Sequence, residues 1–231
     1  MPEQVPIEIL PDRTVTALFY PAAAARDRAG ATLILAPGAG AGQTSTFIVN
    51  FATGLAARGI DTVTFNFLYS EQGRRIPDPN DRLEACWRAV IAAVRGQMKS
   101  GRDKLAIGGK SMGGRIASQV AAAGVEDLAG LVLLGYPLHP PGRPDRPRAS
   151  HLTQIKVPML FVQGSRDAFG TADELRPIIT QLDPPADIYA VERGDHSFKV
   201  PKRSGIRQED VYRAIQDRIA TWLPTAVKTA R

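Results

Sequence analysis

Residues 105–115 read Leu-Ala-Ile-Gly-Gly-Lys-Ser-Met-Gly-Gly-Arg. The apolar start of this stretch predicts a buried strand, and the small residues at 115–123 predict a helix. Between them, Gly-Lys-Ser-Met-Gly at 109–113 fits the Gly-x-Ser-x-Gly pattern of a nucleophile elbow, a turn from strand to helix that presents a serine. Glycine fits on either side because a larger side chain would collide with the neighbouring strand or helix. Ser111 is therefore our candidate nucleophile.

The same motif has two other interpretations. Gly-x-Ser-x-Gly occurs by chance in glycine-rich chains, so it needs support from the rest of the sequence. Residues 109–111 also match the end of a phosphate-binding P-loop, but that loop requires a glycine five residues before Gly109, where this chain has Lys104. The predicted strand also runs directly into the turn and leaves no loop to surround phosphates. We therefore favour the nucleophile elbow.

Length and composition are those of an ordinary globular protein. The 231 residues suit one α/β domain spanning 1–231, with 44% hydrophobic and 23% charged residues. Cys86 is the only cysteine, which excludes an internal disulfide and suits a reducing compartment. Residues 1–10 lack a signal-peptide pattern, and no apolar stretch is long enough to cross a bilayer. We expect a cytoplasmic protein that does not bind membranes.

The net charge of +6 could attract nucleic acid or anionic substrates. The basic residues are scattered, however, apart from a group at residues 199–207. We therefore expect a solvated basic surface and no nucleic-acid partner.

Predicted strands alternate with predicted helices through most of the chain. The strands lie at 5–10, 14–20, 31–36, 60–67, 105–110, 128–135, 157–163 and 186–191, and the helices at 47–58, 81–98, 115–123, 172–182 and 208–223. This alternation predicts an α/β fold with a mainly parallel, twisted sheet and helices on both faces. The first two strands break the alternation, so we expect them to form an antiparallel edge. The segment 137–150 is irregular and too short to be a lid domain.

A serine hydroxyl needs a base to take its proton and an acid to orient that base. In hydrolases built on a sheet of this kind, the order along the chain is serine, acid, histidine. His139 and His151 lie in or beside the proline-rich segment, whereas His196 follows the last predicted strand. A loop histidine is more often only a surface residue, but this position favours His196 as the base.

The acid should follow a strand between the serine and the histidine. Asp167 comes soon after the strand at 157–163 and is our choice, although aspartate is also common in turns. Asp195 is the rival because it adjoins His196. Adjacent residues on a loop rarely bring their side chains into the required orientation, so we prefer Asp167.

A tetrahedral intermediate also needs backbone N–H donors. Met112, directly after the candidate nucleophile, supplies one, and the loop Pro-Gly-Ala-Gly-Ala-Gly at 37–42 should supply the other. Ala39 is our choice, with Gly40 in reserve. The loop also resembles a dinucleotide-binding Gly-x-Gly-x-x-Gly, but Gln43 stands where the third glycine should be. We expect neither a cofactor nor a metal.

Taken together, these motifs resemble those of the α/β-hydrolase superfamily over residues 31–223, most of all its compact, lidless, dienelactone-hydrolase-like branch. Within that branch the chain is similar to a group that contains small bacterial predicted hydrolases, a testis-expressed animal protein and a subunit of a histone acetyltransferase complex. The similarity is carried by residues 37–42, 65–67 (Phe-Asn-Phe), 73–75 (Gly-Arg-Arg), 109–115 and 194–198 (Gly-Asp-His-Ser-Phe). The resemblance implies Ser111 as nucleophile, His196 as base and Asp167 as acid.

There are two departures from the pattern. Dienelactone hydrolases use cysteine where this chain has Ser111, which argues against a dienelactone as the substrate. Many relatives carry histidine where this chain has Pro37, and proline lacks an N–H and fixes φ. The choice between Ala39 and Gly40 therefore stays open.

These expectations favour the hydrolysis of small acyl esters or thioesters. The sequence does not indicate the length of the acyl group or the oligomeric state. Tyr69, Arg74 and Arg75 belong to a polar loop at 68–80 that should overhang the same edge of the sheet, so they are candidate contacts to an anionic substrate; otherwise the loop is simply solvated. The alternative function is a binding or scaffold module that has kept the fold. Acyl transfer would use the same acyl-enzyme as hydrolysis.

Overall fold

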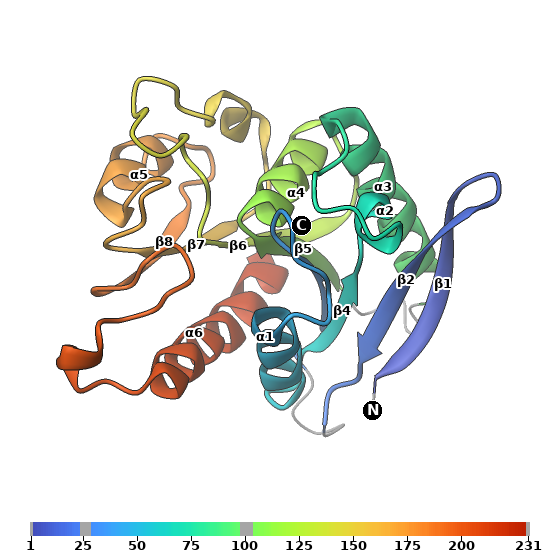
Figure 1. Cartoon of the computed structure of the whole chain (residues 1–231), viewed down its shortest axis with the longest axis horizontal. Coiled ribbons are helices and arrows are strands. Elements are labelled where there is room, and N and C mark those ends of the chain that lie inside the picture. Colours follow the sequence, from blue (N-terminus) through green and yellow to red (C-terminus); the bar gives the residue numbers. More distant parts are fainter. Residues whose placement is uncertain (1, 24–28, 98–103, 230–231) are drawn as a thin grey trace.

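The computed structural model describes residues 2–23, 29–97 and 104–229 (Figure 1). Eight strands form one sheet in the order β1-β2-β4-β3-β5-β6-β7-β8. They are β1 (Glu3–Leu10), β2 (Arg13–Tyr20), β3 (Ala31–Ala36), β4 (Asp61–Phe65), β5 (Lys104–Lys110), β6 (Leu128–Leu134), β7 (Met159–Gly164) and β8 (Asp187–Val191). The strand that leads into Ser111, β5, lies near the middle of the sheet, so the serine is held by neighbours on both sides.

The sheet has a parallel body and an antiparallel edge. β1 pairs antiparallel with β2, and β2 pairs antiparallel with β4, whereas every other pair is parallel. The predicted mainly parallel sheet and its antiparallel edge are both confirmed. Because the parallel strands share one direction, their carboxyl ends lie together. The loops after β3, β5, β6, β7 and β8 therefore gather at the carboxyl ends of the strands.

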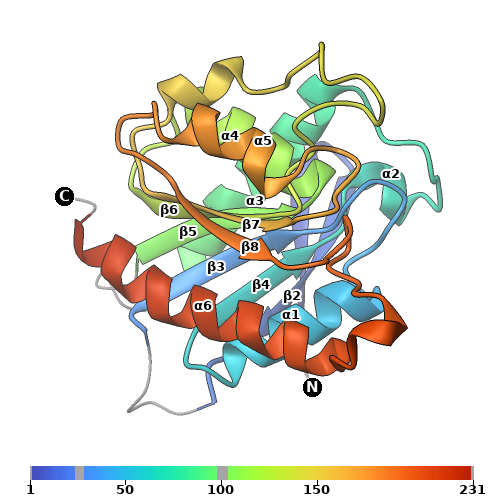
Figure 2. The same ribbon diagram turned by 90° about the vertical axis from the view of Figure 1, so that its left-hand side faces the viewer.

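Helices cover both faces of the sheet, as predicted (Figure 2). α1 and α6 lie on one face, and α3, α4 and α5 lie on the other. Their bounds are α1 (Thr46–Ala56), α3 (Asn80–Gln97), α4 (Met112–Ala122), α5 (Ala172–Ile179) and α6 (Gln208–Thr229); the short helices are α2 (Leu68–Glu71), η2 (Ser150–Gln154) and η3 (Lys202–Ser204).

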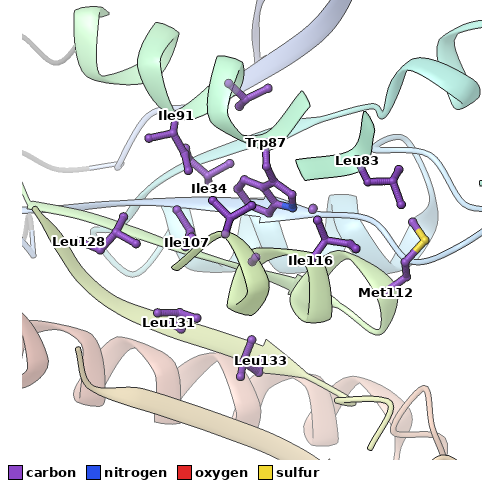
Figure 3. Packing of buried hydrophobic residues seen from close by; sticks show 14 of the residues in the cluster. Ile34, Leu83, Trp87, Ile91, Ile107, Met112, Ile116, Leu128, Leu131 and Leu133 are labelled. Carbon is purple, nitrogen blue, oxygen red and sulfur yellow. The ribbon is translucent and has the colours of Figure 1, made fainter. Parts of the chain in front are cut away.

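Alternation along the central strands divides the core into two layers. Ile34, Ile107 and Leu131 face α3 and α4, whereas their neighbours Leu33 and Val132 face α1 and α6. Figure 3 shows the first layer, where Trp87 of α3 and Ile116 of α4 pack over the sheet. Strands that bury both faces explain the continuous apolar runs in the sequence.

The predicted elements are confirmed, with shifts at their ends. The segment 68–80 was expected to be a loop, but it contains α2, and Tyr69 in that helix is fully buried. The helix after the elbow begins at Met112 rather than at residue 115, because it starts directly from the turn. Met98, the predicted end of the helix at 81–98, lies outside the described residues.

The start of α5 illustrates how local sequence positions an element near the site. Thr171 accepts a hydrogen bond from the Glu174 N–H at 3.3 Å, and Glu174 Oε2 accepts one from the Thr171 N–H at 2.7 Å. This reciprocal capping box satisfies N–H groups that the first turn leaves without partners. It also defines where the loop after β7 ends.

Within the described segments, no helix combines the length and the apolar character that a membrane span requires.

Replacing Ile107 with alanine should lower the free energy of unfolding by about 2–5 kcal/mol, because it opens a cavity in a fully buried layer. Chemical denaturation measures the loss. The matched control is Ile76→Ala, where the side chain is 79% exposed and the change should be within about 0.5 kcal/mol. Equal losses at the two positions would contradict this description of the core.

Candidate active site

Ser111 occupies a strained turn between β5 and α4. Its backbone has φ 52° and ψ −118°, a region that serine rarely adopts. The turn is held by a hydrogen bond from the Ser111 N–H to the Leu134 carbonyl at 2.9 Å. Space around it is very limited: a Cβ on Gly113 would lie 2.5 Å from the Pro37 carbonyl oxygen. The glycine of the motif is therefore required by close backbone approach.

Ser111, His196 and Asp167 form one continuous chain of hydrogen bonds. The Ser111 Oγ lies 2.8 Å from His196 Nε2, and His196 Nδ1 lies 2.8 Å from Asp167 Oδ2. The Asp167 side chain is fully buried, whereas that of His196 is 23% exposed. An imidazole in this position can take the serine proton while the carboxylate orients it and stabilises its charged form.

Gln163, which we did not predict, supports the carboxylate. Its Nε2 donates to Asp167 Oδ2 at 2.9 Å, and its Oε1 accepts from the Tyr136 N–H at 2.8 Å. The other carboxylate oxygen, Asp167 Oδ1, accepts from the Phe169 N–H at 2.8 Å. The sequence signal was a polar residue at the end of an otherwise apolar strand, β7.

Asp195, the rival acid, has a different place. Its Oδ1 accepts from the backbone N–H groups of Ser197 and Lys199, at 2.8 and 2.9 Å. Asp195 therefore closes the turn that carries His196. The Phe169 ring lies against the imidazole, with 4.4 Å between ring centroids, and restricts its rotation.

The remaining histidines contact other groups. His139 Nε2 lies 3.2 Å from Glu174 Oε1, and His151 Nε2 lies 2.8 Å from the Ser118 Oγ. Within the described residues, neither ring forms a hydrogen bond with Ser111, and Ser118 is fully buried. Of the three histidines, His196 is the one that the structure brings to the candidate nucleophile.

The loop after β3 lies beside Ser111. The Gly40 N–H donates to the Tyr69 hydroxyl at 3.4 Å, and the Ala41 N–H donates to the Gly38 carbonyl at 3.2 Å. Within the described part of the chain, the N–H groups of Ala39 and Met112 have no such acceptor. Both residues line the cleft, so their N–H groups are available to a ligand bound beside Ser111.

An open cleft of about 800 Å³ surrounds the Ser111 hydroxyl and His196. Apolar side chains line one part of it, including Phe47, Ile48 and Tyr212. Four cationic side chains also line it: Lys110, Arg115, Arg148 and Lys199.

The three predicted substrate contacts lie outside this lining. Tyr69 is fully buried and stacks on Phe67, with 6.1 Å between ring centroids. Arg74 pairs with Asp78 at 2.6 Å, and Arg75 is exposed on the neighbouring loop. The structure gives Tyr69 a supporting position, through its hydroxyl, under the loop at 37–42.

Among the described residues, no group of three or more His, Cys, Asp or Glu side chains is arranged to hold a metal ion. Cys86 is free and buried, and burial raises the pKa of its thiol to about 12. Its position is that of a core residue.

Comparison with known proteins gives the family directly. Residues 29–224 match the family described as alpha/beta hydrolase domain. The chain belongs to this family. The match covers most of the chain and includes Ser111, Asp167 and His196.

Solved structures of similar fold include three from bacteria. A lidless α/β serine hydrolase from Xanthomonas campestris is 21% identical, with a TM-score of 0.74 over 96% of this chain and 95% of that one. An α/β serine hydrolase homologue from Coxiella burnetii is 20% identical, with a TM-score of 0.72 over 99% and 97%. Dienelactone hydrolase from Anabaena variabilis is 18% identical, with a TM-score of 0.74 over 96% and 96%. The lidless α/β-hydrolase fold expected from the sequence is therefore confirmed.

This α/β hydrolase carries a buried lysine directly before Ser111. Lys110 is 8% exposed, and its Nζ has no hydrogen-bond partner among the described residues. The rings of Phe47 and Phe198 each lie 5.9 Å from the nitrogen. Burial lowers the pKa of Lys110 from 10.5 to about 8, against the opposing effect of Asp167 and Asp195.

Replacing Lys110 with methionine should raise the free energy of unfolding at pH 7 by about 1–3 kcal/mol, because the variant buries no charge. Between pH 8 and 10.5 the unfolded wild-type chain binds more protons at Lys110 than the folded one, so wild-type stability rises with pH there. The advantage of the variant should therefore be complete below about pH 8 and disappear above about pH 10.5.

Denaturant unfolding of both proteins across this pH range measures the difference. The control is Lys104→Met, the same change at an exposed position at the start of β5, which should have little effect at any pH. A difference between wild type and Lys110→Met that does not change with pH would contradict the lowered pKa.

Proposed function

We propose that this α/β hydrolase cleaves small carboxylic esters or thioesters, with Ser111 as nucleophile, His196 as general base and Asp167 as the orienting acid. The observation that supports this most is the pair of 2.8 Å hydrogen bonds that links the three side chains. The geometry is that of a serine nucleophile with its base already in place.

In the first half-reaction, the Ser111 Oγ attacks the carbonyl carbon of the substrate while His196 Nε2 takes the hydroxyl proton. The carbonyl oxygen becomes an oxyanion, held by the N–H groups of Ala39 and Met112. His196 then donates the proton to the leaving alcohol or thiol, and an acyl-enzyme remains on Ser111. The buried Asp167 carboxylate stabilises the imidazolium that exists between the two proton transfers.

In the second half-reaction, water replaces the leaving group. His196 takes a proton from the water as it attacks the acyl-enzyme, and the same oxyanion site is used again. When this second intermediate collapses, the bond between the carbonyl carbon and the Ser111 Oγ breaks and His196 gives its proton to that oxygen, which restores the hydroxyl and releases the carboxylic acid. Another alcohol or thiol in place of water would give acyl transfer from the same intermediate.

The fold relatives support this choice of reaction class. One of the similar structures is described as a serine hydrolase, another as a serine hydrolase homologue and a third as a dienelactone hydrolase. In this chain a serine stands where the dienelactone hydrolases that it resembles use cysteine. That difference favours ordinary esters and thioesters over a dienelactone.

The direct test is labelling with a fluorophosphonate, which reacts with activated serines. Folded wild-type protein should be labelled at Ser111 and should hydrolyse p-nitrophenyl esters or acyl thioesters. Ser111→Ala should lose labelling and at least about 10³-fold in kcat, because the nucleophile is gone while the fold remains. Mass spectrometry locates the label, and circular dichroism checks that the variant is folded.

Folded wild-type protein that neither labels nor turns over any ester or thioester would reject the proposal. That result would favour the other function considered from the sequence, a binding module that has kept the fold. Partner capture with wild-type and Ser111→Ala protein would then be the next measurement.

The two aspartates give a second test. Asp167→Asn should lower kcat by about 10³- to 10⁴-fold, because the amide no longer holds the imidazole in the correct tautomer. Asp195→Asn should lower it by less than about tenfold, because an amide oxygen can still accept the backbone N–H groups. Steady-state kinetics on one p-nitrophenyl ester measures both. A larger loss at Asp195 would make it the acid instead.

A further inference from the structure

The charge around the cleft is one-sided. Lys110, Arg115, Arg148 and Lys199 line it, and none of the described Asp or Glu residues does. Within the described ranges, none of these four cations forms an ion pair. Elsewhere on the surface arginines do pair with carboxylates, as Arg58 does with Asp217 at 2.7 Å. The cleft therefore presents positive charges that no ion pair among the described residues neutralises.

Arg115 and Arg148 lie close enough together to repel each other. Arg115 stands one turn after Ser111 on α4, and Arg148 comes from the irregular segment between β6 and β7. Burial and the nearby Arg148 charge lower the pKa of Arg115. Two like charges in one place are unfavourable unless an anion lies between them.

The hydrogen bonds of Arg115 leave donors for a ligand. Its Nη atoms donate to neutral amide oxygens, those of Gln119 at 3.3 Å and Asn80 at 3.2 Å. Glu84, the carboxylate that acts on Arg115 from farther away, is paired with Arg88 at 3.0 Å. A guanidinium has five N–H groups, so Arg115 can hold an anion without losing these contacts.

Beneath the cleft, Lys110 adds a buried charge without a hydrogen-bond partner. The two carboxylates near it, Asp167 and Asp195, are already engaged with His196 and with backbone N–H groups. The apolar lining comes from α1 and α6, through Phe47, Ile48 and Tyr212, and these helices lie on the face of the sheet opposite to α4, which carries Arg115. The cleft thus has one side for an apolar group and another for a negative one.

We infer that this cleft takes esters or thioesters that carry a carboxylate or phosphate group, and that Arg115 and Arg148 bind that group. The inference rests on the proposed function, because it names the substrate class of the same site. Guanidinium groups suit both anions through paired N–H donors. The anion can belong to the acyl part or to the leaving group, and the experiment separates the two.

The first arm compares the mono-p-nitrophenyl ester of adipate with p-nitrophenyl hexanoate, which have the same acyl length and differ in a terminal carboxylate. The second compares hexanoyl-coenzyme A with the hexanoyl thioester of N-acetylcysteamine, which lacks the phosphates. In at least one arm, kcat/KM should be about tenfold or more higher for the anionic substrate at low salt. The arm that shows this preference tells which part of the substrate carries the anion.

Arg148→Gln should reduce that preference about tenfold, mainly through a higher KM for the anionic substrate. Its side chain is exposed, so the substitution should not prevent folding. The matched control is Arg146→Gln, an exposed arginine of the same segment that lies outside the cleft lining and beside Asp145. The control should keep the preference.

Two results would overturn the inference while the proposed function survives. One is an active enzyme, dependent on Ser111, that does not prefer the anionic substrate in either arm. The other is an equal loss of preference in Arg148→Gln and Arg146→Gln, which would indicate a general effect of positive charge rather than a binding site.

If no substrate is turned over and no fluorophosphonate label appears, the proposed function fails separately. Calorimetry with Ser111→Ala protein then tests the anion site alone. Binding of hexanoyl-coenzyme A that Arg148→Gln weakens, and Arg146→Gln does not, would support the site. Absence of binding would reject it.

Discussion

The positive φ of Ser111 is the constraint on which the site depends. A positive φ is energetically unfavourable for any residue other than glycine, so the surrounding structure has to hold Ser111 in this conformation. Here the carbonyl of Leu134 in β6 accepts a hydrogen bond from the Ser111 N–H. The backbone at the end of β3 and in the loop after it lies so close to Gly113 that a side chain would not fit there. This arrangement sets the serine hydroxyl toward the imidazole and turns the first N–H of α4 toward the cleft. The strand order, the turn at Ser111 and the loop at 37–42 therefore depend on one another.

Most of the fold could be predicted from the sequence because its signals are local. Apolar runs indicated the central strands, and the helical spacing of apolar residues indicated the helices between them. The pattern around Ser111 and the order of serine, acid and histidine led to the three side chains that the structure joins. We preferred Asp167 to Asp195 from simple chain geometry, and in the structure Asp167 is hydrogen-bonded to His196, whereas Asp195 accepts from backbone N–H groups.

The substrate-facing residues were harder to predict because they depend on packing between distant segments. Tyr69 was expected beside the substrate, but α2 turns its ring into the core. Gln163, Lys110 and Arg148 meet the site from three different segments, and no local pattern connects them. Arg148 lies in a stretch without periodicity, where sequence indicates only a loop. The positive charge that lines the cleft could therefore be recognised only from the folded structure.

The hydrogen bond between Ser111 and His196 joins residues 85 positions apart. A ribosome therefore exposes the serine long before it adds the imidazole, and α6, which packs beside the histidine loop, is made later still. During translation the hydroxyl is an ordinary alcohol with no base to deprotonate it. The hydrogen bonds that join Ser111, His196 and Asp167 can form only when the last third of the polypeptide has emerged and folded back, so this site is assembled late in synthesis.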